Sequence, residues 1–259
     1  MNKEFQSINF TIDERVARIT LARPPLNVFN IAMMREIVAA LNECAQQRDL
    51  AAIVFDAALD TRAFSGGVAV EEHVPETVYQ MLDAFHSIFR MMTQIAKPTI
   101  AVVDGPALGG GCELVAACDL VIASDRARFG QPEIKLGVFP PVAALLLPRI
   151  IGEKRACELV LTGELIEADE ALRLGLVNYV VPPEELEQKR EMLLSKLREL
   201  SASSLAMTRA ALDLGARKGF ESALDEVENL YLHELMKTED ANEGVRAFME
   251  KRKPSWRNR

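Results

Sequence analysis

Two glutamates lie in stretches of the chain that are otherwise largely apolar. Glu113 is flanked by Cys112 and Leu114, and Glu133 lies in the segment Phe-Gly-Gln-Pro-Glu-Ile at residues 129–134. An ionised carboxylate in apolar surroundings is costly unless it is paired or used in chemistry. Two such groups held close together would differ in pKa, so that one could act as a general acid and the other as a general base. Two solvated surface glutamates are the alternative that these residues leave open.

Three consecutive glycines at residues 109–111 precede Glu113, at the predicted start of a helix. They are not a phosphate-binding P-loop, because no Gly-Lys-Ser/Thr follows, and they do not form a G-x-G-x-x-G fingerprint in good register. Their backbone N–H groups are uncovered by side chains, and the positive end of the helix dipole lies behind them. Such a place can stabilise an oxyanion. A tight turn is the alternative here, and also for the pair Gly66-Gly67.

The apolar pattern predicts the elements that position these groups. Alternation between apolar and polar residues predicts a hairpin of half-buried strands over residues 8–12 and 17–21. Continuous apolar runs predict strands buried on both faces, at residues 51–55, 99–103 and 120–123. Helical spacing predicts amphipathic helices over residues 31–48 and 78–92, and again over residues 220–235. The C-terminal helices are expected to pack on the α/β body or on a neighbouring subunit.

Composition limits the possible function classes. The chain has 259 residues, 49% of them apolar, and a net charge of −8. This balance is typical of a globular protein and argues against disorder and against a nucleic-acid partner. We find no apolar run long enough to cross a bilayer and no secretory signal, so we expect a cytoplasmic protein without a membrane partner. The three histidines and four cysteines have no metal-ligand spacing, so no metal site is predicted and the cysteines are expected to be reduced core residues.

The chain resembles the crotonase family, the enoyl-CoA hydratase/isomerase superfamily, nearly from end to end. The resemblance rests on four segments: Leu-Ala-Arg-Pro at 21–24, Phe-Ser-Gly-Gly at 64–67, Ala-Leu-Gly-Gly-Gly-Cys-Glu-Leu at 107–114 and Phe-Gly-Gln-Pro-Glu at 129–133. It implies an α/β fold, a spiral of strand-strand-helix units over residues 1–182 that holds a CoA-thioester site. A helical trimerisation region over residues 183–259 is implied as well. The implied partners are an acyl-CoA substrate and further copies of the chain, as a homotrimer or dimer of trimers, with no cofactor beyond the substrate's coenzyme A.

The resemblance also implies roles for individual residues. Glu113 and Glu133, 20 positions apart, match the catalytic glutamates of the family's hydratases, which favours water addition over isomerisation, dehalogenation or decarboxylation. By position, the N–H groups of Val68 and Gly110 would form the oxyanion hole for the thioester carbonyl. The resemblance places substrate-binding residues at Asn27, Ala63, Gly66, Gly67, Gly109, Phe139 and Val142. His73 is expected at the surface, with the mouth of the pocket as the alternative.

Two departures from the family pattern narrow the expected substrate. Residues 68–71 read Val-Ala-Val-Glu where the family usually has Ala-Asp-hydrophobic-Lys, which removes an expected phosphate contact. Residues 139–146 read Phe-Pro-Pro-Val-Ala-Ala-Leu-Leu in place of Pro-Gly-x-Gly-Gly-Thr, a bulkier wall that suits a compact ring. The chain is similar to the branch that hydrates cyclohexa-1,5-diene-1-carbonyl-CoA to 6-hydroxycyclohex-1-ene-1-carbonyl-CoA in anaerobic aromatic degradation. The alternatives are a general 2-enoyl-CoA hydratase/isomerase of fatty-acid oxidation and a non-catalytic crotonase-fold binding protein.

The charge is unevenly distributed along the chain. Residues 250–259 contain five Lys and Arg against Glu250 alone, a local net charge of +4. This segment is expected to be either a solvated basic tail or a contact to the coenzyme phosphates. The overall acidity therefore does not argue against an anionic thioester substrate.

Overall fold

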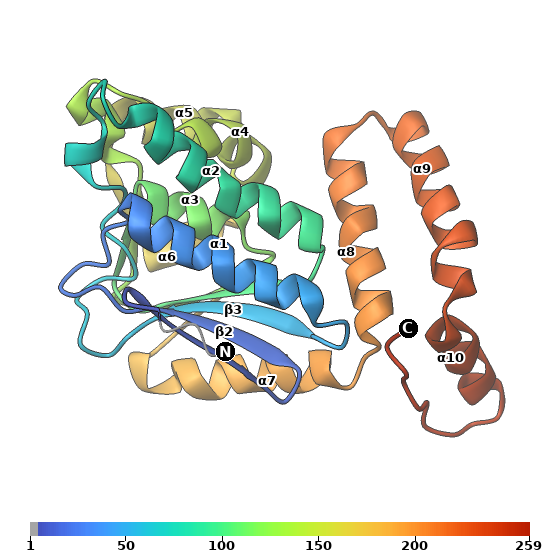
Figure 1. The fold of residues 1–259 in the computed structure, drawn as a ribbon. Coiled ribbons are helices and arrows are strands. Elements are labelled where there is room, and N and C mark those ends of the chain that lie inside the picture. The colour runs from blue at the N-terminus through green and yellow to red at the C-terminus, as the bar shows by residue number, and fades with distance from the viewer. Residues whose placement is uncertain (1–4) are drawn as a thin grey trace.

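A computed structural model describes residues 5–259 and places the N-terminal hairpin at one edge of a sheet (Figure 1). Strands β1 (Ile8–Asp13) and β2 (Val16–Leu21) pair antiparallel, as the alternation predicts. The sheet continues in the order β1-β2-β3-β4-β6-β9. The further strands are β3 (Ala52–Ala57), β4 (Thr99–Val103), β6 (Leu120–Ser124) and β9 (Tyr179–Val181).

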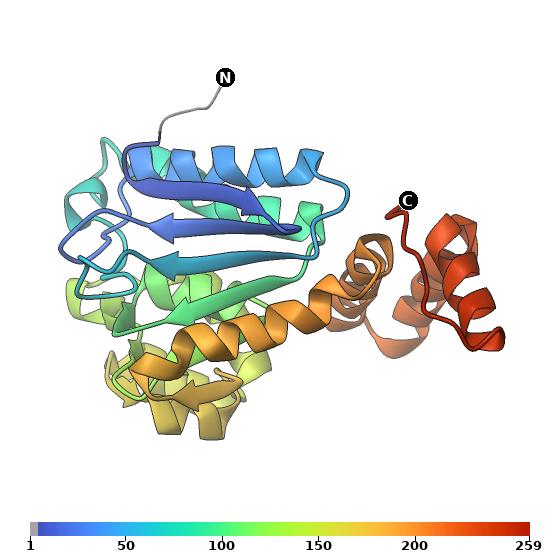
Figure 2. The same ribbon diagram turned by 90° about the horizontal axis from the view of Figure 1, so that it is seen from below.

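Strands β2, β3, β4, β6 and β9 of this sheet run parallel, so their carboxyl ends meet at one edge of the sheet. Helices α1 (Ile31–Gln46), α2 (Val78–Ile95) and α3 (Gly110–Ala117) bury one face of this sheet. Helix α7 (Leu186–Arg198) covers the other face, where Leu186 and Leu194 pack against apolar side chains of the strands (Figure 2). The layers are therefore helix, sheet and helix, and the first helix after the Pro182-Pro183 junction packs on the sheet itself.

The strands of a smaller sheet alternate along the chain with the later strands of the main sheet. Strands β5 (Pro106–Leu108), β7 (Arg128–Gly130) and β8 (Leu165–Glu167) form it in that order. Three short helices accompany it: α4 (Pro141–Ile150), α5 (Glu153–Thr162) and α6 (Ala168–Leu174). Phe129 on β7 is fully buried, and the 3₁₀ helix η2 (Pro132–Leu136) follows directly, so the buried strand fixes where η2 begins.

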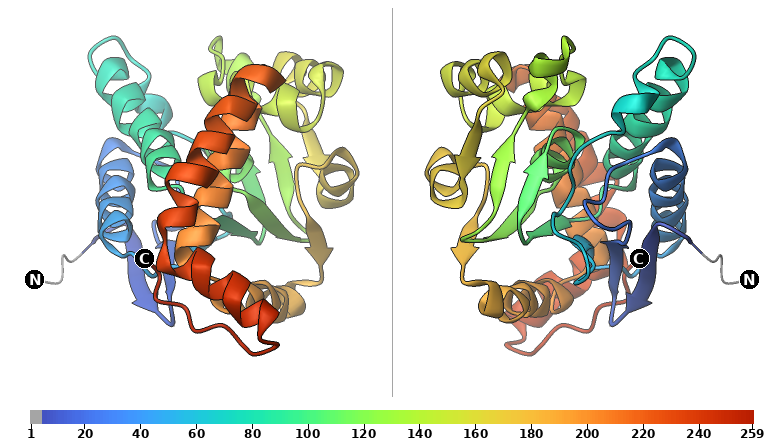
Figure 3. Two further views of the ribbon diagram at one scale, coloured as in Figure 1. Left: turned by 90° about the vertical axis from the view of Figure 1, so that its right-hand side faces the viewer. Right: turned by 90° about the vertical axis from the view of Figure 1, so that its left-hand side faces the viewer.

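The last three helices stand beside the α/β body (Figures 1 and 3). They are α8 (Ala202–Arg217), α9 (Phe220–His233) and α10 (Glu239–Met249), with the 3₁₀ helix η4 (Leu235–Lys237) before α10. The apolar stripe predicted on α9 is exposed in the single chain, with Phe220 76% and Tyr231 54% accessible. An exposed stripe of this size on a helix is a feature of subunit contacts.

The basic C-terminal segment is folded back on these helices. The buried Asp240 accepts hydrogen bonds from the N–H groups of Arg257 and Asn258, at 2.6 and 2.9 Å. Arg252 forms an ion pair with Glu243 at 2.6 Å. The backbone of this segment is therefore held within the chain, while its Lys and Arg side chains are exposed, as expected for a solvated basic tail.

The structure also bears on the expected burial of the cysteines and on membrane-spanning helices. Cys44 and Cys112 are buried and Cys118 is half-buried, but Cys157 is exposed on α5, so the prediction of a core residue is wrong there. Within residues 5–259, no helix combines the length and the apolar character that crossing a membrane requires.

Candidate active site

Glu113 and Glu133 line one cavity of about 440 Å³. Glu113 lies in the first turn of α3 and is 2% exposed, whereas Glu133 lies in η2 and is half-buried. The alternative of two solvated glutamates is therefore wrong. The cavity walls are mainly apolar, and they include Val68, Val70, Val78, Met81, Leu82, Phe85, Leu136, Val138 and Phe139.

The two glycine loops pack against each other at this cavity. Gly67 has a φ of +102°, and a β-carbon there would lie 3.1 Å from the carbonyl oxygen of Leu108 and 3.6 Å from the nitrogen of Gly110. A β-carbon on Gly110 would lie 2.8 Å from Cγ2 of Val68. This close approach requires glycine on both sides and brings the backbones of residues 67–68 and 109–110 together.

The N–H groups of Val68 and Gly110 are both available to a ligand. In the part of the chain that the structure describes, neither has a hydrogen-bond partner. Gly110 is the first residue of α3, so its N–H is one of those that a helix leaves unpaired, at the positive end of the dipole. Two N–H donors in adjacent loops can bind one oxygen that carries a developing negative charge.

Helix α4 holds the carboxylate of Glu113. Its Oε1 atom accepts hydrogen bonds from the N–H groups of Val142 and Ala143, both at 2.8 Å, in the first turn of α4. The pKa of Glu113 is raised to about 7, chiefly by burial and in part by the charge of Glu133, against the opposing effect of the two backbone donors. A carboxyl group with a pKa near neutrality is suited to proton transfer.

Glu133 lies directly against the glycine loop. Its Oε1 atom is 2.6 Å from the point that a β-carbon on Gly109 would occupy. Its Oε2 atom is buried and has no hydrogen-bond partner among the described residues. Burial raises the pKa of Glu133 as well. The site therefore holds two carboxyl groups that both retain protons more readily than in water.

The sequence-predicted substrate-binding residues fall into two groups. Gly66, Gly67, Gly109 and Phe139 line the cavity, with Phe139 68% exposed at its mouth. Asn27, Ala63 and Val142 do not line it. Val142 instead acts through its backbone, as the donor to Glu113 described above.

Asn27 is buried and its side chain is engaged within the protein. Its Oδ1 accepts from the N–H of Arg23 at 2.8 Å, and its Nδ2 donates to the carbonyls of Ala63 and Phe64, both at 3.1 Å. Asn27 therefore ties the loop after β2 to the chain that leads into Gly66 and Gly67.

Sequence reasoning missed one feature of the site, and it gave a second, His73 at the cavity, only as the alternative. The Ala143 N–H donor left no signal, because a backbone donor depends only on where α4 begins in space. His73, expected at the surface, is half-buried and lines the cavity. It follows the 3₁₀ helix η1 (Val70–Glu72), and this single turn directs the chain back over the cavity.

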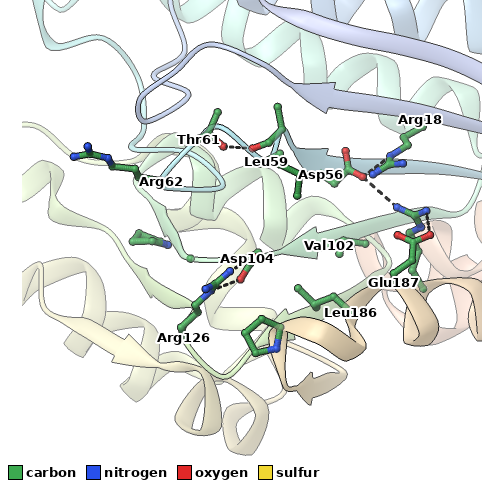
Figure 4. Close-up of a pocket in the computed structure, with 16 residues that line it drawn as sticks. Arg18, Asp56, Leu59, Thr61, Arg62, Val102, Asp104, Arg126, Leu186 and Glu187 are labelled. Atoms are coloured by element: carbon green, nitrogen blue, oxygen red, sulfur yellow. Dashed lines mark hydrogen bonds and ion pairs between the residues drawn. The ribbon is translucent and has the colours of Figure 1, made fainter.

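A second cavity, of about 500 Å³, lies on the α7 face of the sheet (Figure 4). Apart from Arg62, its charged side chains pair with one another. Asp56 forms ion pairs with Arg18 at 2.5 Å and with Arg190 at 3.4 Å. Arg126 donates a hydrogen bond to Asp104 at 2.6 Å. Such paired charges link α7 and neighbouring loops to the sheet, and they leave little unbalanced charge for a ligand.

Comparison with known proteins was made over the whole chain. A family model described as enoyl-CoA hydratase/isomerase matches residues 11–259. A Mycobacterium tuberculosis protein named a probable enoyl-CoA hydratase is 39% identical, over 98% of this chain and 99% of its own length. The cyclohexa-1,5-dienecarbonyl-CoA hydratase of Thauera aromatica is also 39% identical, over 95% of each chain. A crystal structure of enoyl-CoA hydratase from Mycobacterium smegmatis superposes with a TM-score of 0.91 at 33% identity, covering 97% of this chain and 99% of the other.

Proposed function

The chain belongs to the enoyl-CoA hydratase/isomerase family, and from this membership we propose that it is a hydro-lyase that adds water to a conjugated acyl-CoA thioester. The observation that carries the proposal is the pair of buried carboxyl groups, Glu113 and Glu133, in one apolar cavity beside two unpaired backbone donors. Acid, base and oxyanion binding are the three requirements of water addition next to a thioester carbonyl.

The backbone donors polarise the substrate. The N–H groups of Val68 and Gly110 bind the thioester oxygen, and they bind it more strongly as negative charge develops there. One well-aimed donor of this kind contributes about 3 kcal/mol to the stability of a transition state. The thioester carbonyl then withdraws electrons from the conjugated double bonds, so that the β-carbon becomes open to attack by water.

We assign the base to Glu113 and the acid to Glu133. The two N–H donors on Oε1 of Glu113 favour its ionised form, which accepts a proton from water as the C–O bond forms. Oε2 of Glu133 is buried without a hydrogen-bond partner among the described residues and burial raises the pKa of this carboxyl group, so we assign Glu133 as the acid that delivers a proton to carbon. The enolate collapses to the thioester, and the sum is the addition of one water molecule.

For the acyl group we propose a compact conjugated ring, cyclohexa-1,5-diene-1-carbonyl-CoA. Hydroxyl adds to ring carbon 2, a proton adds to carbon 5, and the remaining double bond moves between carbons 1 and 6, which gives 6-hydroxycyclohex-1-ene-1-carbonyl-CoA. The support is the similarity to the Thauera aromatica hydratase and the bulky start of α4, where Phe139, Pro140 and Pro141 line the cavity. The similarity to the Mycobacterium tuberculosis protein supports a linear 2-enoyl-CoA equally well, as the second candidate.

One comparison of rates tests these proposals. Hydration of cyclohexa-1,5-diene-1-carbonyl-CoA is measured against hydration of crotonyl-CoA, with the Glu113→Gln and Glu133→Gln variants as controls for the active site. A higher kcat/KM for the cyclic diene supports the ring substrate, whereas a higher value for crotonyl-CoA supports the general hydratase. Absence of turnover with both thioesters would favour a non-catalytic binding protein instead.

We also propose that the chain assembles as a homotrimer or a dimer of trimers. The support is the exposed apolar stripe on α9, which includes Phe220 and Tyr231. Helix α9 lies on the far side of α8 from the α/β body (Figure 1). Burial of such a stripe between subunits removes it from water. This stabilises the assembly by about 25 cal/mol for each Å² of apolar surface that is buried.

A further inference from the structure

His73 is the third side chain with a titratable or strongly polar group on the wall of the active-site cavity. Among the described residues that line this cavity, only His73, Glu113 and Glu133 carry such groups. The two glutamates have roles in the proposed hydration, but His73 has none. A single imidazole in an otherwise apolar wall is a group that can orient a ligand.

The hydrogen bonding of His73 fixes which ring nitrogen is available. Its Nδ1 lies 2.9 Å from the carbonyl oxygen of Ala69. Because a carbonyl oxygen only accepts, Nδ1 carries the hydrogen, and in the tautomer that this bond selects Nε2 is the acceptor. Among the described residues, the hydrogen-bond partner of the His73 ring is Ala69, through Nδ1.

We propose that His73 is a specificity-determining residue whose Nε2 binds an oxygen substituent on the acyl group, beyond the β-carbon. The inference rests on the proposed acyl-CoA occupancy of this cavity. The glutamates already serve the β-carbon and the site of protonation, so His73 is left for a more distant part of the acyl group. This role of His73 widens the proposed substrate class to CoA thioesters of hydroxylated acids. The hydroxyl group of the acid donates a hydrogen bond to Nε2.

A purely structural role for His73 is the competing explanation. The bond from Nδ1 to Ala69 anchors the residue that follows Val68, so loss of the ring would disturb the oxyanion loop. Asparagine and glutamine separate the two roles. The amide nitrogen of Asn stands near the position of Nδ1 and keeps the bond to Ala69, whereas the amide of Gln reaches the position of Nε2.

The test measures binding of saturated thioesters by calorimetry. One series is cyclohexanecarbonyl-CoA with its 3-hydroxy and 4-hydroxy derivatives, and a second pair is butyryl-CoA with 4-hydroxybutyryl-CoA. Their hydroxyl groups lie beyond the β-carbon, so the reverse of hydration cannot eliminate them. Wild-type protein, His73→Asn and His73→Gln are compared through the ratio of Kd values within each series.

We expect at least one hydroxylated ligand to bind the wild-type protein about three- to tenfold more tightly than its parent, the effect of one hydrogen bond. His73→Gln retains this preference, and His73→Asn loses it. Equal binding of every hydroxylated ligand and its parent to the wild-type protein would overturn the inference, as would a preference that survives in His73→Asn. A structural role alone weakens parent and hydroxylated ligands by the same factor. If the proposed hydration itself is wrong, this appears separately, as absent turnover of cyclohexa-1,5-diene-1-carbonyl-CoA and of crotonyl-CoA. The butyryl-CoA pair makes the binding test independent of the proposed cyclic acyl group.

Discussion

The Oε1 atom of Glu133 lies 2.6 Å from the position of a β-carbon on Gly109. Gly109 also has a φ of +51°, so both the backbone and the neighbouring carboxyl group favour glycine there. Gly109, which lies between β5 and α3, is thus fixed by the geometry of the site and by the turn together. The approach explains why the glycine run and Glu133, 24 positions apart in the sequence, act as one unit.

Replacement of Gly109 by alanine tests this relationship. The new methyl group must displace the Glu133 carboxyl group, and a misplacement of about 1 Å costs on the order of 100-fold in rate. The positive-φ backbone of Gly109 adds a loss of about 1–3 kcal/mol in the free energy of unfolding. We therefore expect kcat to fall about 100-fold in a protein that still folds, measured by hydration kinetics and urea denaturation.

Gly152→Ala is the matched control for backbone strain. Gly152 has a φ of +81°, but no atom lies within 4 Å of its would-be β-carbon. This variant should lose a similar amount of stability and keep its rate of hydration. An equal loss of rate in both variants would show that strain, rather than displacement of Glu133, is responsible.

Glu113→Gln is predicted to stabilise the protein while it removes activity. Burial raises the pKa of Glu113 from 4.5 to about 7, so between these pH values the native state binds more protons than the unfolded chain. The free energy of unfolding of the wild type therefore falls as pH rises through this window, by up to about 3 kcal/mol from this group. Glutamine keeps an oxygen for the Val142 and Ala143 donors but carries no charge.

The measurement is urea denaturation of wild type and Glu113→Gln at pH 5 and pH 8, at one protein concentration. We expect the variant to be more stable than wild type at pH 8 by about 1–3 kcal/mol and the difference to shrink at pH 5. Activity should fall at least 100-fold, since a general base contributes about 10²–10⁴. A variant that is less stable than wild type at pH 8 would contradict the assignment of a strained, buried charge.

Much of the fold and part of the site could be predicted from the sequence. The hairpin, the buried strands and the helix after the glycine run follow from periodicity and turn residues, which act locally. Glu113 and Glu133 could be identified because a carboxylate among apolar residues is unusual at any position. The family resemblance placed both residues in one site.

Other features depend on contacts between distant segments and leave no local pattern. The N–H donors to Glu113 come from α4, about thirty positions away, and any residue type except proline supplies such a donor. The buried orientation of Asn27 is likewise set by the carbonyls of Ala63 and Phe64. His73 was expected at the surface because a lone histidine in a loop is more often found there, and its place on the cavity wall agrees with the alternative, the mouth of the pocket.

The proposed trimer predicts an effect of charge on the α9 stripe. Phe220→Asp with Tyr231→Asp places two charges on positions that are exposed in the single chain but buried in the proposed interface. We expect wild type to have the mass of three or six chains by light scattering and the double variant to have the mass of one. Leu59→Asp, at a fully exposed loop position, is the control. A wild-type mass of one chain would contradict the proposal directly.

A buried carboxylate on α10, that of Asp240, holds the C-terminal segment. Asp240 is 1% exposed and accepts from the N–H groups of Arg257 and Asn258 and from the hydroxyl of Ser201, which begins α8. Asp240→Ala leaves these donors unpaired and should lower the free energy of unfolding by about 2–4 kcal/mol. Deletion of residues 255–259 removes two of the same bonds, so the combined variant should lose clearly less than the sum of the two single losses. Urea denaturation at one protein concentration measures this coupling, and strictly additive losses would show that Asp240 does not hold the segment.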